Sequence, residues 1–202
     1  MATSINKPSR SDSRRQHVLD AAAELFADRG YHATSIRDIA KGIGASPGAV
    51  YAHFGSKAQL LVAVYEEGAG GIGEAVDRAV AVASDAWDCL EAACRAHLET
   101  LLEPSPYARV VIRVHPGDIP EIESELIAVR DRYEARFRQP LEALGDRVEA
   151  IWPRLMLLGA MNWAPYWYRP GAGQRPSDIA ERFVHILRHG CDRQVTGGYA
   201  DD

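Results

Sequence analysis

The cysteines and histidines of this 202-residue chain do not stand at the spacings of a reactive or metal-binding site. Cys89, Cys94 and Cys191 form no Cys-x-x-Cys pair, and their odd number argues against a disulfide framework. His185 and His189 are four residues apart, but no glutamate follows the first histidine as in zinc peptidases, so we interpret both as packing residues. We therefore predict no catalytic residue, no metal site and no cofactor.

Four glycines between Gly68 and Gly73 form a second pattern. The run Gly-x-Gly-Gly-x-Gly could be mistaken for a phosphate-binding loop, but it lacks a preceding strand and a following Lys-Ser or Lys-Thr pair. Each glycine disfavours a helix by about 1 kcal/mol relative to alanine. We therefore predict a break or hinge in the helix at this segment.

Charge is distributed unevenly along the chain. Residues 1–57 hold eight Lys and Arg against five Asp and Glu, a net charge of +3, so that the total of −5 leaves −8 for residues 58–202. A basic N-terminal part followed by an acidic remainder is typical of a DNA-binding domain joined to a domain with a different function. A charge of +3 is too small for strong non-specific DNA binding.

The elements that must position these groups are all helices. No segment shows the two-residue alternation or the Asn-Gly turns of a sheet, so the sequence predicts an all-α fold. Breakers divide the chain into predicted helices at about residues 14–28, 34–42, 46–54, from 56 onward, 85–102, 106–114, 120–144, 148–167 and 177–194. Either Thr34 or Ser35 is the predicted N-cap of the second helix, and Ser46 and Ser56 are predicted N-caps of the next two. Pro47 occupies the first-turn position that proline prefers.

The second and third predicted helices share one apolar face. This face consists of Ile36, Ile39, Ala40, Ile43, Val50 and Phe54. Because a tight turn joins the two helices, they must pack against each other, which leaves the opposite face of the third helix free. A DNA major groove has the width to admit one such helix.

The window from Thr34 to Lys57 reads TSIRDIAKGIGASPGAVYAHFGSK, and it is preceded by AAAELFADRGYHA. It resembles the helix-turn-helix domain of the TetR family of transcriptional regulators. The resemblance implies a homodimer that binds double-stranded operator DNA. The DNA-binding residues that follow from this match are Thr34, Ser35, Arg37, Ser46, Pro47, Gly48, Ala49, Tyr51, His53 and Lys57.

The resemblance also implies roles for individual side chains. Tyr51, His53 and Lys57 are expected to contact the DNA backbone, while Arg37 is the side chain best able to read a base edge and Ala49 could touch a thymine methyl group. Gly48 and Ala49 replace longer hydrogen-bonding residues of many relatives, so we expect specificity to depend on Arg37 and on DNA shape. Ordinary structural roles stay open for each residue, and for Phe54 we favour the core.

A second resemblance lies in the run GAMNWAPYWYRPGAGQRPSDIAERF near the C-terminus. It is similar to a TetR subgroup of fatty-acid and steroid catabolism repressors, several of which sense acyl-CoA thioesters. In the family the last two long helices pair into a four-helix dimer interface. Here the apolar residues predicted for it are Leu155, Leu158, Met161, Ala180, Phe183, Val184 and Leu187.

A pocket for a small hydrophobic effector is expected between the middle helices. Its candidate residues are Trp87, Tyr107, Arg109, Arg113, Tyr133, Phe137 and Trp163. The arginines belong to a basic group with His115 and Arg130 that could bind an anionic ligand or pair with Asp118, Glu121, Glu123 and Glu125. Core packing is the alternative for each aromatic residue.

Taken together, the sequence predicts four parts: a flexible arm (1–13), a helix-turn-helix domain (14–57), a helical effector-binding and dimerisation domain (58–196) and a flexible tail (197–202). The predicted function is ligand-responsive repression from a pseudo-palindromic operator, in the cytoplasm and without a membrane segment. The alternatives are a small all-α enzyme, for which we find no motif, and a DNA-binding protein without effector control.

Overall fold

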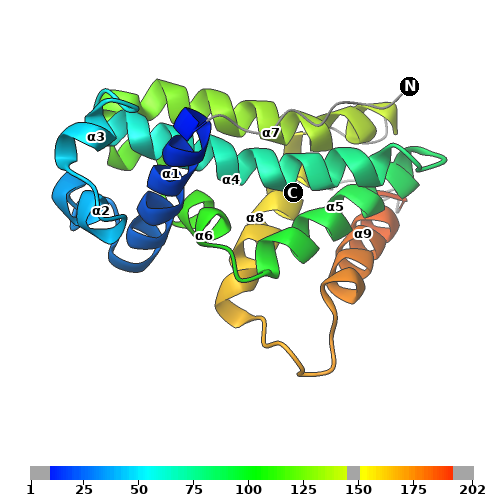
Figure 1. Cartoon of the computed structure of the whole chain (residues 1–202). Coiled ribbons are helices and arrows are strands. Elements are labelled where there is room, and N and C mark those ends of the chain that lie inside the picture. The colour runs from blue at the N-terminus through cyan, green and yellow to red at the C-terminus, as the bar shows by residue number, and fades with distance from the viewer. Residues whose placement is uncertain (1–9, 145–150, 193–202) are drawn as a thin grey trace, which may run out of the picture. The chain divides into compact units, whose positions relative to one another are not determined.

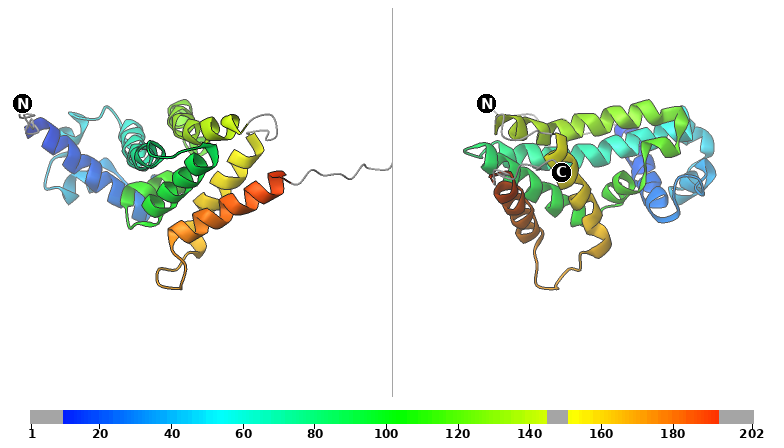
Figure 2. Two further views of the ribbon diagram at one scale, coloured as in Figure 1. Left: turned by 90° about the vertical axis from the view of Figure 1, so that its right-hand side faces the viewer. Right: turned by 180° about the vertical axis from the view of Figure 1, so that it is seen from behind.

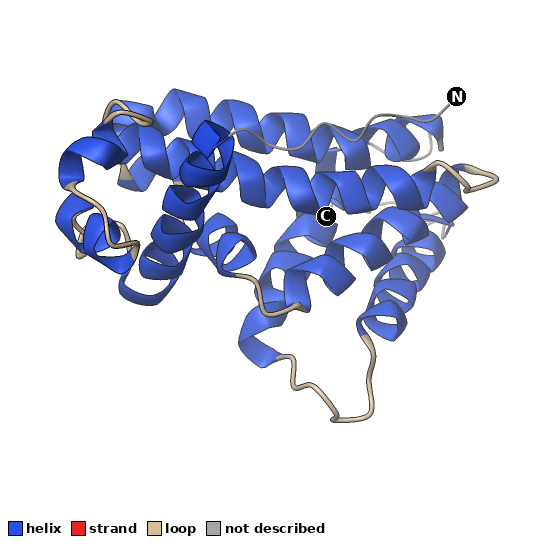
Figure 3. Cartoon of the chain, viewed as in Figure 1, coloured by secondary structure: helices blue, strands red, loops and turns tan. Residues whose placement is uncertain are grey.

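The computed structural model describes residues 10–144 and 151–192, and this part of the chain is helical without a strand (Figures 1 and 3). The helices are α1 (Arg10–Arg29), α2 (Ile36–Gly42), α3 (Pro47–Tyr51), α4 (Lys57–Val80), α5 (Ala86–Leu102), α6 (Pro106–Arg113), α7 (Glu123–Ala143), α8 (Ile151–Trp167) and α9 (Pro176–Asp192). Two short 3-10 turns, η1 (Pro116–Asp118) and η2 (Pro120–Ile122), precede α7. The all-α prediction is confirmed.

Helix α1 begins earlier than predicted. Arg10 to Ser13 already belong to the helix, so the described end of the predicted arm is helical. Asp12 lies in the first turn, where its carboxylate stabilises the positive end of the helix dipole. The rest of the arm and the tail at 197–202 lie outside the described residues.

The contacts divide the chain into two compact units. The first contains the described residues of 1–70 and 105–130, and the second contains those of 71–104 and 131–202. The first unit therefore combines the helix-turn-helix with the start of α4, with α6 and with the start of α7. This division does not coincide with the predicted boundary after residue 57, because α6 packs along α1 within the first unit.

The core of the first unit joins the helices that the apolar pattern predicted. Its largest contributors are Leu19 and Phe26 of α1, Ile39 of α2, Val50 of α3, and Leu60 and Leu61 of α4. Residues Val110, Ile122 and Leu126 from α6, η2 and α7 complete it. Phe54 is 6% exposed and belongs to this core, as predicted.

Helix α4 runs without a break from Lys57 to Val80, so the predicted interruption at Gly68 to Gly73 is wrong. Two of its glycines are needed for close packing. A Cβ at Gly68 would lie 2.8 Å from the carbonyl oxygen of Tyr107, and one at Gly73 would lie 2.8 Å from the guanidinium carbon of Arg136. Burial of the neighbouring side chains in both cores offsets the low helix propensity of glycine.

The second unit packs α5 against α9 and α8 (Figure 2). Its buried residues are Val76, Leu90, Ala93, Cys94, Ala96, Leu98, Phe137, Leu141, Leu157, Leu158, Met161, Ala164, Ile179, Ala180, Val184 and Leu187. His97 of α5 is 2% exposed among these apolar neighbours. Apart from Thr34, it is the only residue of the described chain classed as both polar and buried.

Candidate nucleic-acid interface and effector domain

The turn between α2 and α3 is fixed by local chemistry. Ser35 caps α2 through a bond from the Asp38 N–H to its hydroxyl, and Asp38 in turn accepts the Ser35 N–H at 2.9 Å. The Ser35 hydroxyl also donates to Oδ2 of Asp38 at 2.5 Å. This bond, followed by the one from the Ser35 N–H, holds the pKa of Asp38 below its ordinary value. Gly44 follows with φ of +63°, a left-handed conformation that glycine adopts without steric cost. Ser46 then caps α3, whose first residue is Pro47.

Helix α3 presents one buried and one accessible face. Val50 is fully buried, whereas Tyr51 is 52% exposed on the other side. Ser46 and Gly48 are also exposed, and Pro47, Ala49 and His53 are partly exposed. The small residues at the start of α3 leave its backbone open to a close approach. This arrangement can present a short helix to a groove, which is the geometry the sequence predicted.

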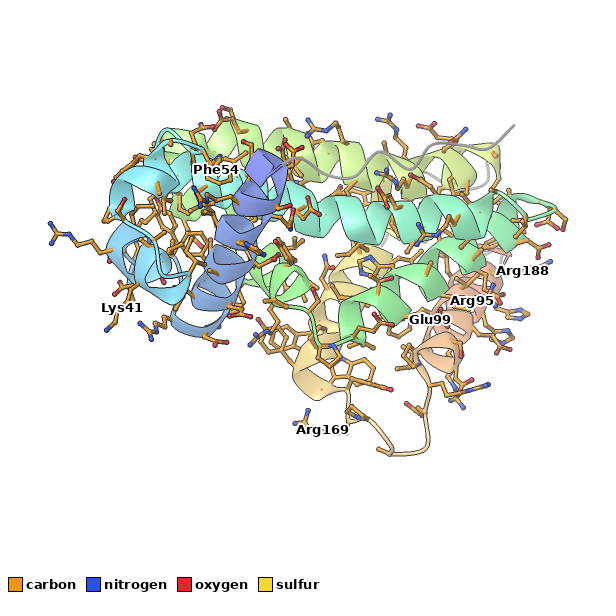
Figure 4. All side chains as sticks on the ribbon, in the orientation of Figure 1. Lys41, Phe54, Arg95, Glu99, Arg169 and Arg188 are labelled. Carbon is orange, nitrogen blue, oxygen red and sulfur yellow. The ribbon has the colours of Figure 1, made fainter. Side chains whose placement is uncertain are left out.

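Helix α2 adds positive charge. Arg37 and Lys41 are both exposed, and their spacing of four residues places them on the same face of the helix. Lys41 lies at the outer side of α2, whereas Phe54 lies among the helices (Figure 4). Both cations are therefore available for a DNA backbone or base.

Two predicted DNA contacts point into the protein. Thr34 is 1% exposed, and its hydroxyl donates to the carbonyl oxygens of Gly30 (2.9 Å) and Leu25 (3.2 Å). Lys57 donates from Nζ to the carbonyl oxygens of Tyr31 and Thr34, both at 3.0 Å. These side chains tie the turn after α1 to the start of α4, so we do not count Thr34 or Lys57 among the accessible groups of this surface.

Two residues of α1 belong to this region although sequence reasoning did not select them. Arg14 and His17 line a hollow of about 330 Å³ together with the α2–α3 turn. Its remaining lining residues are Ile43, Gly44, Ala45, Ser46 and Ala49. The available signal was the spacing of three residues between Arg14 and His17, which places both on one face of α1. The neighbouring Arg15 is engaged elsewhere, since its guanidinium lies 5.0 Å from the centre of the Phe54 ring.

The predicted effector residues on α6 are bonded to α1. The Tyr107 hydroxyl donates to Oδ1 of Asp20 at 2.7 Å, and burial, followed by this bond, raises the pKa of Tyr107 above its usual range. Arg109 pairs with Asp28 at 2.9 Å, and Arg113 donates to the carbonyl oxygen of Ala27. Arg109 thus pairs with an acid of α1 instead of the four acids considered from the sequence.

The other predicted effector residues lie in the second unit. Tyr133 and Phe137 of α7 form a cluster with His97, whose ring centres are 5.8 to 5.9 Å apart. Trp87 is half-buried beneath the guanidinium of Arg188, 5.4 Å away. Trp163 is 61% exposed and stacks on Tyr166 at 4.4 Å, so it lies at the surface.

The apolar residues predicted for the dimer interface also need correction. Leu158, Met161, Ala180, Val184 and Leu187 are buried in the second unit's own core, and Phe183 packs against it. Only Leu155 of the predicted set is well exposed, at 49%. The exposed apolar surface is made instead by Ile151, Trp152, Leu155, Met156, Trp163, Tyr166 and Trp167 of α8 and by Ile186 of α9. The sequence pattern located the helices but assigned the wrong face, because it could not tell which neighbour each face meets.

Among the described residues, the histidines and cysteines form no further site. The rings of His185 and His189 are 4.0 Å apart, and in the described parts of the chain no group of three or more His, Cys, Asp or Glu is arranged for a metal ion. Cys94 is buried, which raises the pKa of its thiol to about 12. No helix of the described residues is long and apolar enough to cross a membrane.

Comparison with known proteins decides the family. Residues 18–64 match the pattern described as bacterial regulatory proteins of the tetR family, and residues 83–191 match the tetracyclin repressor-like C-terminal domain. The chain belongs to the TetR family. This TetR-family regulator is 29% identical over 172 residues to the transcriptional activator FasR of Mycolicibacterium smegmatis, covering 83% of this chain and 76% of FasR.

Two further similarities cover nearly the whole regulator. The transcriptional repressor KstR2 of Mycobacterium tuberculosis (strain H37Rv) is 24% identical, with 91% of this chain and 95% of KstR2 covered. The crystal structure of AibR in complex with isovaleryl coenzyme A and operator DNA is 23% identical, with a TM-score of 0.74 over 86% of this chain and 97% of AibR. FasR is thus a transcriptional activator and KstR2 a transcriptional repressor.

Proposed function

We propose that this TetR-family regulator is a ligand-responsive repressor that binds a pseudo-palindromic operator as a homodimer in the cytoplasm. The observation that carries the proposal is the accessible face of α3. Val50 of α3 and the following Phe54 are buried, while Ser46, Gly48 and Tyr51 are exposed and Pro47 and Ala49 are partly exposed. Exposed Arg37 on α2 supplies the donor pair that suits guanine. Arg14 and His17 add backbone contacts beside the same turn.

Dimerisation is supported by the exposed apolar residues of α8 and α9. Trp152 of α8 and Ile186 of α9 are each 64% exposed, and large exposed apolar side chains are expected at an interaction surface. A second copy of the chain is the partner that a palindromic site requires, since each half-site must receive one α3. Size-exclusion chromatography with light scattering tests this point, and Trp152→Glu is expected to give a monomer.

The effector we propose is an acyl-CoA thioester. Support comes from the resemblance of the C-terminal run to regulators of fatty-acid and steroid catabolism, and from AibR, whose structure contains isovaleryl coenzyme A. The effector domain of this chain offers an apolar interior to an acyl chain. Repression, as opposed to activation, is part of the proposal, because relatives of both kinds exist.

Control follows from a population shift. Helix α4 contributes residues to both compact units, so a change in the effector domain can alter the state of the helix-turn-helix. To move the protein from mostly bound to mostly released, the effector must prefer the released state by several kcal/mol.

The deciding experiment measures binding of the purified protein to labelled DNA from upstream of its own gene, with acyl-CoAs of increasing chain length as competitors. Saturable protection of one short palindrome, released by a thioester, supports the repressor. Broad salt-sensitive coating of DNA would favour a DNA-binding protein without effector control. Absence of DNA binding, together with turnover of a thioester, would favour the enzyme.

A further inference from the structure

His97 is a buried polar side chain, and one of its two ring nitrogens has no hydrogen-bond partner in the described part of the chain. Its Nδ1 is hydrogen-bonded to the hydroxyl of Tyr133, while Nε2 is buried and has no partner among the described residues. A buried polar atom without a partner costs about 1 to 3 kcal/mol, so proteins contain few of them and each needs an explanation.

The surroundings decide which nitrogen carries the proton. Burial lowers the pKa of His97 to about 4 against the smaller, raising effect of a hydrogen bond with the Asn162 side chain, so the ring is neutral at pH 7. By distance and angle, Nε2 still has no hydrogen-bond partner within the described residues. Burial also raises the pKa of Tyr133 above its usual range, so its hydroxyl keeps its hydrogen. Either group of this pair can donate, depending on the tautomer of the ring. We assign the hydroxyl as the donor, so that Nδ1 accepts and Nε2 carries the ring hydrogen.

We propose that His97 is the residue that recognises the effector, its Nε2–H donating a hydrogen bond to the carbonyl oxygen of an apolar acyl compound. This inference rests on the proposed function. It names the contact by which the protein would select its effector. A hydrogen-bond donor that is left unpaired when a ligand lacks the matching acceptor is a strong means of discrimination.

The charges nearby favour a neutral carbonyl over a carboxylate. Arg136 lies 5.9 Å from the Tyr133 ring and already makes two bonds of 2.8 Å to Asp77. Arg154 of α8 lies 3.6 Å from a carboxylate oxygen of Glu134. A free carboxylate beside His97 would therefore have to compete with these acids for a cation. A thioester or ester carbonyl needs only the donor that Nε2 provides.

The side chains packed around His97 are mostly apolar. Phe137 and Tyr133 supply flat apolar faces, and Cys94 and Met161 in the same core are small or flexible. The side chain of Asn162 on α8 lies beside the His97 ring, and Asn162 is exposed. A polar side chain therefore lies between the ring and the surface. The proposal places the carbonyl at Nε2 and the acyl chain among these apolar side chains, which must move apart to admit it.

The test uses two ligands that differ only in the carbonyl group. Octanoyl-CoA and its thioether analogue S-octyl-CoA are titrated calorimetrically into the full-length protein without DNA. Wild type is expected to bind the thioester about tenfold more tightly than the thioether. His97→Phe should bind both with the thioether's affinity, and His97→Gln, whose side-chain N–H can replace Nε2–H, should restore the difference.

Two results would overturn the assignment: equal binding of both ligands by wild type, or a tenfold difference that survives in His97→Phe. The assignment would also be overturned if the protein still protects its operator but binds no acyl-CoA from butanoyl to stearoyl. Failure of the protein to bind DNA would instead remove the proposed function, since the calorimetric comparison does not depend on DNA.

A second variant guards against misfolding. In His97→Phe/Tyr133→Phe both polar partners are replaced by apolar rings of similar shape. The melting temperature of this free protein should equal or exceed that of wild type, with the ligand discrimination lost. A large fall in melting temperature would mean that the pair serves the fold, and would count against the proposal.

Discussion

The ammonium group of Lys57 lies 4.1 Å from the centre of the Tyr31 ring and donates to the Tyr31 carbonyl oxygen at 3.0 Å. A second bond of 3.0 Å reaches the carbonyl oxygen of Thr34. One side chain at the start of α4 thus holds the turn that leads into α2. Family resemblance assigned this lysine to a DNA phosphate, whereas the structure gives it two carbonyl partners.

Replacing Lys57 by Met should therefore act through stability. We expect the free energy of unfolding to fall by about 1 to 2 kcal/mol, because the part-buried carbonyl groups of Tyr31 and Thr34 each lose the bond from Nζ. The Tyr31 carbonyl oxygen keeps the Thr34 N–H at 3.2 Å. DNA affinity should fall while its dependence on salt stays the same. A lost phosphate contact would instead reduce the slope of log K against log salt by about 0.9. Thermal unfolding and DNA titrations at several salt concentrations separate the two cases.

Arg37→Ala should relax sequence recognition. A bidentate contact of arginine with guanine contributes about 1 to 3 kcal/mol of discrimination, so operator variants at one base pair should become nearly equivalent. Lys41→Ala is the matched control on the same face of α2 and should weaken binding to all variants alike. Competition binding with single-base variants measures both. If discrimination survives in Arg37→Ala, the side chain does not read a base.

The glycines of α4 allow a paired prediction. Gly68→Ala should destabilise the protein by roughly 1 to 3 kcal/mol, because the added methyl group would overlap the Tyr107 carbonyl oxygen. Gly71→Ala should stabilise it by about 0.5 to 1 kcal/mol, because nothing lies within 4 Å of its Cβ and alanine favours the helix. Calorimetric melting of both variants is the measurement.

The same glycines bear on regulation. If the segment acts as a hinge between the two units, Gly70→Ala/Gly71→Ala should reduce the response of DNA binding to the effector, although neither methyl group meets a neighbour. An unchanged effector response would remove the hinge from the mechanism and leave the glycines with a packing role alone.

His97 should make stability depend on pH. Its folded pKa of about 4 lies below the ordinary value of 6.5, so the unfolded chain binds a proton between these pH values and the folded chain does not. The stabilisation is complete above pH 6.5 and is lost as the pH falls toward 4, by about 2 kcal/mol between pH 7.5 and pH 5.

The measurement is the melting temperature at these two pH values in wild type and in His97→Gln, whose side chain does not titrate. The difference between the two proteins isolates His97 from the other histidines. The raised pKa values of Tyr133 and Cys94 keep both neighbours from titrating in this range. Parallel curves for the two proteins would show that the ring is not held neutral by burial.

The sequence by itself determined the local elements of this regulator. Ser35 and Ser46 cap helices and Gly44 turns the chain because these effects depend on neighbouring residues only. The apolar spacing likewise placed Val50 and Phe54 in the core and left Tyr51 outside. The family could be identified for the same reason, since its motif is contiguous along the chain.

Only the tertiary structure decided what each side chain meets. Gly68 looked like a helix breaker, yet it lies where α6 approaches α4 too closely for a methyl group. Leu158 and Trp163 are both apolar residues of α8, and only the packing of α5 and α9 decides that the first is buried and the second exposed. The unused nitrogen of His97 depends in the same way on Tyr133, 36 residues away. Such contacts join distant segments, and no local pattern in the sequence encodes them.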